Sequence, residues 1–316
     1  MLCGGPASAS ISSRSVSEHH YQAAAGLPPL QDALRAKLES ENRIRLRDHQ
    51  MLMVTAGSNM AFYHALLAIC DPGDEVVIMS PFYFNHEMAI CMANCQPVLA
   101  ETDASYQPQL DVIESVLTDR TRAVVTISPN NPAGVVYRTE DITAVNELCR
   151  QRGLYHISDE AYEYFTYGDS RHFSPGSLED SSRHTISLFS FSKAYGLASW
   201  RVGYMVAPRK LLSALEKSQD TILICPPVIS QRAALGALEA GRQYCTPFVE
   251  EIARVMNGTA GVGSGEGSTH VFSFAEGSGS THNNLFTITQ NGALLTNAVL
   301  DHETAPTLSI RVKGTD

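Results

Sequence analysis

The sequence predicts an α/β protein of three layers, with a largely parallel sheet between two layers of helices. From Met51 onward, short apolar runs alternate with segments of helical pattern. Turn signals separate these segments, as in Asp71-Pro72-Gly73-Asp74. Apolar strands that alternate with helices indicate a sheet that is covered on both faces.

The first part of the chain precedes this pattern. Residues 1–18 are rich in Ser, Gly and Ala and lack a hydrophobic signal core, so we expect an irregular leader. This leader has one basic residue, whereas a transit peptide normally has more arginine. A loop then leads into a helix that continues to about Asn42, because leucines recur at helical spacing (Leu30, Leu34 and Leu38).

The alternation defines the later elements. Strands are expected at residues 51–56, 75–79, 98–101, 123–127, 154–157, 185–189 and 202–206. Helices are expected at 59–70, at 85–93, from about 109, and at 139–152, the last with Thr139 as its N-cap. Ligands bind beyond the carboxyl ends of the strands in such sheets, so residues just after strands are the candidates for a site.

Length and composition limit the possible functions. The 316 residues suffice for one large domain, with or without a small one, and 18% charged residues are ordinary for a globular protein. A net charge of −10 argues against nucleic acid as the main partner. No apolar run approaches the roughly 20 residues of a membrane span. The seven cysteines lack zinc spacing, so we expect no metal, and free thiols in the reducing cytoplasm.

A lysine and an arginine flank the turn between the last two predicted strands. Lys193 follows a strand, between small hydroxyl residues and an aromatic-Gly turn, where it can project into a cleft. Arg201 enters the next strand. The amine is a potential nucleophile, and the guanidinium is a permanent cation suited to an anion. A solvated lysine and a surface arginine would also explain this pair.

The segment Gly57-Ser58-Asn59 lies where a strand turns into a helix. The glycine allows close backbone approach, and the first-turn N–H groups with the Ser58 hydroxyl make an anion site. Arg201 can reach the same anion. A tight turn with Ser58 as its cap is the simpler alternative.

Other strand ends carry aromatic or polar residues. Tyr83 can cover a flat ring, although core packing explains it equally well. Asn131 lies in a loop between two prolines, and two asparagines in so constrained a loop exceed what a turn requires. Asp159 follows an apolar strand, where an ionised carboxylate is costly unless a cation meets it. Tyr162 follows one helical turn later and can present its phenol beside that acid.

These groups together point to one ligand, pyridoxal phosphate. Its aldehyde forms a Schiff base with a lysine, its phosphate needs an anion cradle, and its pyridine nitrogen needs a carboxylate. Each motif alone is a weak signal. The full set predicts this cofactor.

Several segments also carry a family resemblance, namely VTAGSNMAF, DPGDEV, SPFYFNHEMA, SPNNPAGVVY, YHISDEAYEYF and SFSKAYGLASWRVGYMV. The chain resembles the fold-type I pyridoxal-phosphate aminotransferases of class I/II, and most of all the bacterial aspartate and aromatic aminotransferases. The resemblance extends from about Tyr21 to Met256. It implies a PLP-transferase-like large domain and a homodimer.

The resemblance implies roles for individual residues. Lys193 would be the Schiff-base lysine, Asp159 would pair with the pyridine nitrogen, and Tyr83 would stack on the ring. Asn131 and Tyr162 would contact the 3′-oxygen. The phosphate would be held by groups from several strand ends, namely Ser58, Asn59, Ser190, Arg201 and Tyr21 of the partner subunit.

The resemblance stops after Met256. We therefore expect a cofactor-binding large domain at 19–256 and an incomplete or atypical small domain. Residues 257–316 contain nine Gly, fifteen Ser or Thr and only two basic residues, a composition typical of a linker or tail. Family members have an arginine in the small domain that grips the substrate carboxylate, and Arg311 lies in only a faint match to that strand.

The implied reaction is transfer of an amino group between an amino acid and a 2-oxo acid, of the aspartate or aromatic type. The composition of 257–316 keeps an alternative open. The chain would then be a truncated homologue that binds the cofactor or a partner without turnover. The sequence does not determine which amino acid is the donor.

Overall fold

The computed structural model describes residues 20–256 and four short strands beyond them, at 271–274, 286–288, 294–296 and 312–315. The expected leader and Arg311 lie outside the described residues. The chain divides into two units, Met1–Thr246 and Pro247–Asp316, and each is treated by itself.

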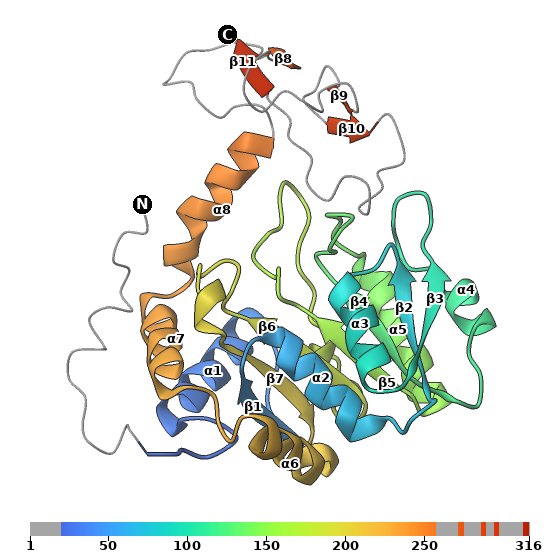
Figure 1. The fold of residues 1–316 in the computed structure, drawn as a ribbon, viewed down its shortest axis with the longest axis vertical. Helices are drawn as coiled ribbons and strands as arrows, with labels where there is room; N and C mark the ends of the chain where they lie inside the picture. Colours follow the sequence, from blue (N-terminus) through green and yellow to red (C-terminus); the bar gives the residue numbers. More distant parts are fainter. Residues whose placement is uncertain (1–19, 257–270, 275–285, 289–293, 297–311, 316) are drawn as a thin grey trace. The chain divides into compact units, whose positions relative to one another are not determined.

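Seven strands form one sheet in the first unit, in the order β1-β7-β6-β5-β4-β2-β3 (Figure 1). The strands are β1 (Gln50–Thr55), β2 (Glu75–Ser80), β3 (Gln96–Glu101), β4 (Thr121–Ile127), β5 (Tyr155–Asp159), β6 (Thr185–Ser190) and β7 (Gly203–Pro208). β7 is antiparallel to both of its neighbours, and all other pairs are parallel. The expectation of a largely parallel sheet is confirmed.

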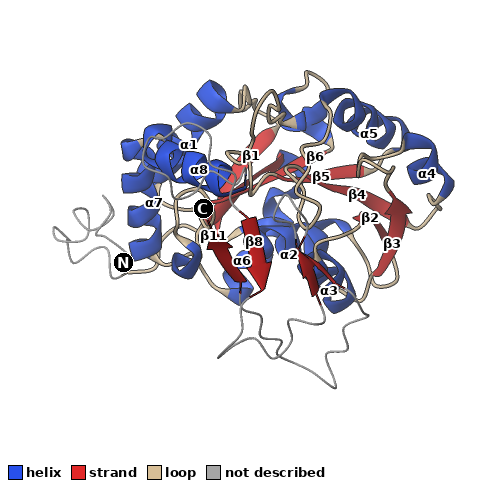
Figure 2. Ribbon diagram, turned by 90° about the horizontal axis from the view of Figure 1, so that it is seen from above, coloured by secondary structure: helices blue, strands red, loops and turns tan. Residues whose placement is uncertain are grey.

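Helices cover both faces of this sheet (Figure 2). They are α1 (Pro28–Glu41), α2 (Ser58–Ile69), α3 (Phe84–Met92), α4 (Leu110–Ser115), α5 (Thr139–Arg152), α6 (Leu212–Ile222) and α7 (Val228–Ala240). Short 3-10 turns lie at Pro175–Ser177, Ser181–Arg183, Ala198–Trp200 and Arg209–Leu211. Seen along the sheet, α2, α3 and α6 lie on one side and α1, α4, α5 and α7 on the other. The three-layer prediction is therefore confirmed.

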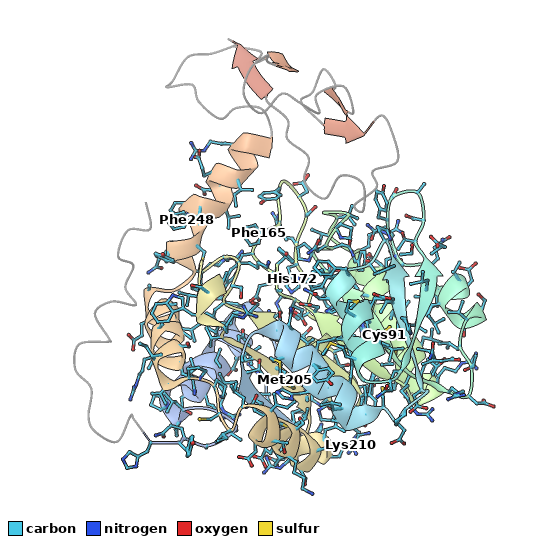
Figure 3. All side chains as sticks on the ribbon, viewed as in Figure 1. Cys91, Phe165, His172, Met205, Lys210 and Phe248 are labelled. Carbon is cyan, nitrogen blue, oxygen red and sulfur yellow. The ribbon has the colours of Figure 1, made fainter. Side chains whose placement is uncertain are left out.

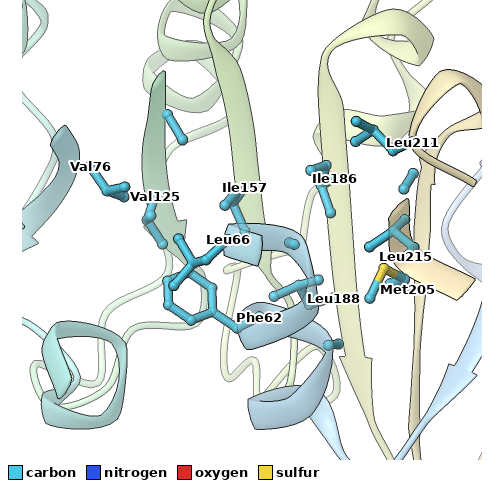
Figure 4. Packing of buried hydrophobic residues seen from close by; sticks show 14 of the residues in the cluster. Phe62, Leu66, Val76, Val125, Ile157, Ile186, Leu188, Met205, Leu211 and Leu215 are labelled. Atoms are coloured by element: carbon cyan, nitrogen blue, oxygen red, sulfur yellow. The ribbon is translucent and has the colours of Figure 1, made fainter. Parts of the chain in front are cut away.

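Side chains fill the space between the sheet and its helices, including Met205 of β7 (Figure 3). The larger apolar cluster lies under α2, where Phe62 and Leu66 are fully buried against Ile157 and Leu188 (Figure 4). A second cluster lies on the opposite face under α4 and α5. Full burial of one such side chain contributes about 1.5–3 kcal/mol, so these clusters fix the strands whose ends carry the site.

One expected helix cap is wrong. α5 begins at Thr139, but its N-cap is Arg138, whose backbone is extended, and no side chain caps the helix. Thr139 is already the first helical residue. Glu140 and Asp141 lie in the first turn, where their negative charges interact favourably with the positive end of the helix dipole.

In the second unit, two strand pairs are described. β8 (Val271–Phe274) is antiparallel to β11 (Val312–Thr315), and β9 (Phe286–Ile288) is antiparallel to β10 (Leu294–Thr296). The helix α8 (Arg242–Met256) spans the division between the two units. Among the described residues, no helix has the length and apolar character needed to cross a membrane.

Candidate cofactor site

Polar side chains from several strands meet at one edge of the sheet. Five parallel strands end there, namely β1, β2, β4, β5 and β6, and each is followed by a predicted site residue. β7 runs the other way, so its start lies at the same edge. This is why Arg201, two residues before β7, joins residues that follow the other strands.

These residues line a pocket with an empty volume of about 560 Å³. Nine of the predicted site residues face it, namely Ser58, Asn59, Tyr83, Asn131, Asp159, Tyr162, Ser190, Lys193 and Arg201. Four other lining residues were not predicted, namely Ile127, Ala161, Ser192 and Ala198.

The remaining two predicted residues lie elsewhere. Gly57 lies behind the pocket, against Arg201. Tyr21 is 78% exposed and does not line the pocket of its own chain. Its role in a partner subunit stays a prediction.

The turn after β1 is shaped to receive an anion. Gly57 has a φ of +84°, and a Cβ there would lie 2.5 Å from Arg201 Nη2, so a side chain would displace the guanidinium. α2 begins at Ser58, and no side chain caps it. Its first-turn N–H groups and the positive end of the helix dipole therefore face the pocket.

The guanidinium of Arg201 is held in place beside this turn. Its Nη1 donates to the carbonyl oxygen of Ala198 (2.8 Å) and to Ser192 Oγ (3.4 Å). Ser190 Oγ accepts a hydrogen bond from the Ser192 backbone N–H (3.1 Å), which fixes the start of the loop that carries Lys193. The cradle thus combines a fixed cation with hydroxyl groups.

Asp159 is a buried carboxylate with two hydrogen-bond partners. Its Oδ2 lies 3.0 Å from His86 Nε2, and its Oδ1 accepts the backbone N–H of Ala161 (3.0 Å). His86 stacks on Phe62, with ring centroids 4.1 Å apart, and meets the edge of Tyr83 at 5.2 Å. The buried acid therefore has a positioned imidazole, which supplies the partner that its burial demands.

His86 is the residue that sequence analysis missed. It lies three residues after Tyr83 in the first turn of α3, so the two share one helix face. A histidine at this spacing from the predicted ring cover was the available signal. Its link to Asp159, 73 positions later, depends on the sheet order and could not be found from local pattern.

Asn131 and Tyr162 contact one another, as expected for two groups that face a shared ligand atom. Asn131 Nδ2 donates to the Tyr162 hydroxyl oxygen (3.2 Å). The preceding Asn130 holds the loop instead, because its Nδ2 donates to Tyr137 and its Oδ1 accepts from Ala133. The two asparagines thus have separate roles, one structural and one facing the pocket.

Lys193 lies beside the same phenol. Its Nζ is 5.0 Å from the centroid of the Tyr162 ring, a cation–π distance. Within the described part of the chain, no acidic side chain forms an ion pair with it. The amine is exposed at the pocket and available for covalent chemistry.

The donor set fits pyridoxal phosphate. An amine, a buried carboxylate, a phenol, an aromatic ring and an anion cradle line one pocket. The absence of a side chain at Gly57 leaves room for the Arg201 guanidinium beside the start of α2, where both can meet the same anion. Among the described residues, no group of three or more His, Cys, Asp or Glu is arranged to hold a metal ion.

This chain belongs to the aminotransferase class I and II family, whose model matches residues 7–260. Members of this family use pyridoxal 5′-phosphate. The fold described above is that of such a protein, so the family resemblance seen in the sequence is confirmed.

Individual relatives agree with this assignment. The chain is 34% identical to a probable aspartate/prephenate aminotransferase of Aquifex aeolicus over 69% of this chain and 56% of that protein. It is 35% identical to the aromatic aminotransferase ISS1 of Arabidopsis thaliana over 72% of this chain and 58% of that protein. The crystal structure of an aromatic aminotransferase from Pyrococcus horikoshii superposes with a TM-score of 0.74 at 31% identity, over 79% of this chain and 67% of that one. The chain spans less than two thirds of the length of the curated relatives it matches.

Proposed function

We propose that this protein is a pyridoxal-phosphate-dependent aminotransferase that transfers an amino group between an amino acid and a 2-oxo acid. One observation carries the proposal. The amine of Lys193, the buried carboxylate of Asp159 and the anion cradle at Ser58 and Arg201 line a single pocket. No simpler ligand requires all of them.

When bound, pyridoxal phosphate supplies an electrophilic aldehyde and a ring that withdraws electron density from the substrate α-carbon. Lys193 would hold the cofactor through its amine. Once free, its Nζ would accept the proton that leaves the substrate α-carbon. The Tyr162 ring lies beside this amine, with its centroid 5.0 Å from Lys193 Nζ.

The other residues position charge and geometry. Asp159, held by His86 and Ala161, keeps a proton on the pyridine nitrogen. Tyr83 would cover the ring, and the Ser58 turn with Arg201 would hold the phosphate, so these residues would fix the orientation of the ring. Asn131 and Tyr162 orient the 3′-oxygen through their shared contact.

The substrate class follows from the relatives alone. Their names specify aspartate, prephenate and aromatic substrates. We therefore include amino acids of the aspartate or aromatic type in the proposal. Arg311, the candidate for the substrate carboxylate, lies outside the described residues.

A homodimer and a cytoplasmic location are also part of the proposal. Tyr21 is exposed, and the segment that follows it is anchored on α6, where Gln219 donates to the Ala24 carbonyl oxygen. Ile222 and Leu223 at the end of α6 are exposed as well. These apolar residues mark a surface on which a second copy can dock. Free thiols at the described cysteines support a reducing compartment.

The test of the cofactor role is reduction and mapping. Purified protein is loaded with pyridoxal phosphate and reduced with borohydride, and its peptides are sequenced. We expect the pyridoxyl label on Lys193 and no label in Lys193→Ala. The exposed Lys210, whose Nζ lies over the Tyr155 ring outside the pocket, provides the matched control variant Lys210→Ala. A label on another lysine would contradict the proposal.

The alternative function is a homologue that binds the cofactor without turnover. The composition of 257–316 is the observation in its favour. Aspartate, phenylalanine, tyrosine and methionine are supplied with a 2-oxo acid to the loaded protein, and product amino acid is measured. Turnover with any of them supports the aminotransferase. Labelling at Lys193 with no turnover supports the alternative.

A further inference from the structure

Two tyrosines behind the pocket, Tyr164 and Tyr195, have no part in the proposed reaction. Each lies two residues after a pocket residue, Tyr164 after Tyr162 and Tyr195 after Lys193. Both are buried, with 6% of each residue exposed, and neither lines the pocket. The same spacing therefore places a buried tyrosine behind each of these two pocket residues.

Each tyrosine belongs to a tight turn that its pocket residue begins. The carbonyl oxygen of Tyr162 accepts the N–H of Phe165 (2.8 Å), and the carbonyl oxygen of Lys193 accepts the N–H of Gly196 (3.0 Å). In both turns, at 162–165 and 193–196, the tyrosine is the residue before the last. A hydrogen-bonded turn leaves the backbone between its two ends little freedom. A displacement of either tyrosine is therefore passed on to the pocket residue of the same turn.

The two turns touch one another both in the pocket and behind it. In the pocket, Lys193 Nζ lies 5.0 Å from the centroid of the Tyr162 ring. Behind it, the hydroxyl oxygens of Tyr164 and Tyr195 are 3.3 Å apart, and the two rings meet edge to face with centroids 5.8 Å apart. Tyr164 donates its proton to Glu41 Oε2 of α1 (2.5 Å), so Tyr195 is the donor in the contact between the two hydroxyls. A chain of hydrogen bonds thus leads from the Lys193 turn through Tyr164 to α1.

The ring of Tyr164 is held firmly within this chain. Lys37 Nζ lies 5.5 Å from its centroid, and the guanidinium carbon of Arg242 lies 5.0 Å from it, both at cation–π distances. Burial raises the pKa of Tyr164 and of Tyr195 above the ordinary value of tyrosine. Both hydroxyls therefore keep their protons, and with them their hydrogen bonds, throughout the neutral pH range.

We propose that Tyr195 and Tyr164 are positioning residues, and that their hydroxyl contact fixes the Lys193 amine relative to the Tyr162 phenol. The inference rests on the proposed function, in which Lys193 acts at the cofactor. Because neither tyrosine lines the pocket, each acts through the residue in front of it. Misplacement of a reacting group by about 1 Å can lower a rate about 10²-fold. The loss of this one contact should cost less, because the hydrogen bonds that close the two turns remain.

Tyr195→Phe and Tyr164→Phe test the contact, because each keeps the ring and removes only the hydroxyl. Single-turnover absorbance of the loaded protein measures the half-reaction with an amino acid of the aspartate or aromatic type. We expect each variant to lose about 10-fold in maximal rate. The half-saturating amino-acid concentration should stay within about 2-fold, with cofactor content unchanged, whereas a general loosening of the fold would alter both. Tyr106→Phe, at an exposed position after β3, should match the parent.

The double variant Tyr195→Phe/Tyr164→Phe shows whether the two hydroxyls act as one contact. It should be no slower than Tyr164→Phe alone, because that single variant already breaks the contact. If the two losses multiplied instead, the hydroxyls would act independently and the proposal would be wrong. Half-reaction rates of both single variants equal to the parental rate would overturn it equally.

Hydrogen exchange in the unloaded protein tests the coupling without any reaction. Tyr195→Phe should speed amide exchange on the order of 10-fold in the turn at 162–165 as well as in its own turn, and Tyr164→Phe should do the reverse. Thermal unfolding shows that each variant is folded. Parental exchange rates in the opposite turn would refute the coupling. A parent protein without a half-reaction would instead contradict the proposed function, and the exchange rates would still decide whether the contact couples the two turns.

Discussion

The buried carboxylate of Asp159 shows how single residues determine the site. Removing an ionised group from water is costly, and the protein compensates with the His86 imidazole and the Ala161 N–H. Sequence analysis predicted that a cation must meet this acid, because the acid follows an apolar strand. The resemblance paired the acid with the pyridine nitrogen of the cofactor. The imidazole could not be identified, because its position beside Asp159 depends on the pairing of distant strands.

At the residue scale, Asp159→Asn tests the electrostatic role of this acid. A neutral amide cannot keep the pyridine nitrogen protonated, although Lys193 can still hold the cofactor. We expect cofactor retention with a loss of about 10²-fold or more in the rate of the amino-acid half-reaction. Single-turnover absorbance changes measure that rate.

The matched control for this variant is Asp141→Asn, at a carboxylate on the surface of α5 that pairs with Arg138. Its half-reaction rate should equal that of the parent. If Asp159→Asn keeps the parental rate in a protein that shows the half-reaction, the assigned role is wrong.

At the scale of elements, the segment after β5 has two faces. Asp159 and Tyr162 face the pocket. Glu163 instead points to α1, where its carboxylate meets Lys37 Nζ at 2.5 Å and accepts from Asn42 Nδ2 at 2.7 Å. This buried network fixes the segment to α1, and so it holds the pocket residues from behind. The sequence predicted the pocket face from the position at a strand end. It could not predict the other face, because Lys37 looked like any other residue of an exposed helix.

Lys37→Met should destabilise the fold by about 3–5 kcal/mol, because it leaves the Glu163 carboxylate buried without its cation. The double variant Lys37→Met/Glu163→Leu removes both charges and should recover most of that loss. Urea unfolding of the three proteins measures the free energies.

An exposed pair supplies the control for the Lys37 series. Arg45 and Glu39 form an ion pair with side chains that are more than half exposed. Arg45→Ala should change stability by less than about 0.5 kcal/mol. A similar small change for Lys37→Met would show that the buried pair does not hold α1 to the segment after β5.

Two buried histidines should make the folding stability of this protein depend on pH under acidic conditions. Burial lowers the pKa of His64 in α2 to about 4, and it lowers the pKa of His156 in β5 to about 3, with His184 adding to the second effect. In the unfolded chain histidine titrates near about 6.5, so the unfolded state binds more protons below that pH. Stability is therefore fully present above about pH 6.5 and falls as pH drops toward about 4, by up to about 1.4 kcal/mol per pH unit for each histidine.

Removing one histidine should flatten that dependence. His64 Nδ1 lies 3.0 Å from Ser218 Oγ of α6, so His64→Gln keeps a polar contact while removing the titration. Urea unfolding between about pH 4 and 7 should show a smaller slope for this variant than for the parent. His20→Gln, at an exposed position, should leave the slope unchanged. Equal slopes for His64→Gln and the parent would refute the assignment.

At the scale of the whole molecule, the sheet explains why so much of the site was visible in the sequence. Parallel strands end at one edge, so residues far apart in the chain could be grouped by a single property, their position after a strand. Local pattern did not reveal the reversal of β7. That reversal follows from the short connection after β6, which contains one 3-10 turn and no crossover helix. It matters because it brings Arg201 to the same edge as the other residues.

The last prediction concerns residues 257–316. All seven strands of the large sheet and every lining residue of the pocket lie within residues 50–208. The first unit therefore has the strands, turns and cofactor groups that it needs before Met256. From its composition, with nine Gly and fifteen Ser or Thr, we predict that this segment does not form a packed small domain with a fixed arginine for the substrate carboxylate. We expect limited proteolysis to cut soon after about residue 256 and to leave a core that still binds pyridoxal phosphate, as measured by mass and cofactor absorbance. A protease-resistant 257–316 segment would contradict this prediction. It would also be contradicted if Arg311→Ala raised the KM for an amino acid without changing cofactor binding. That second result would identify Arg311 as the carboxylate ligand.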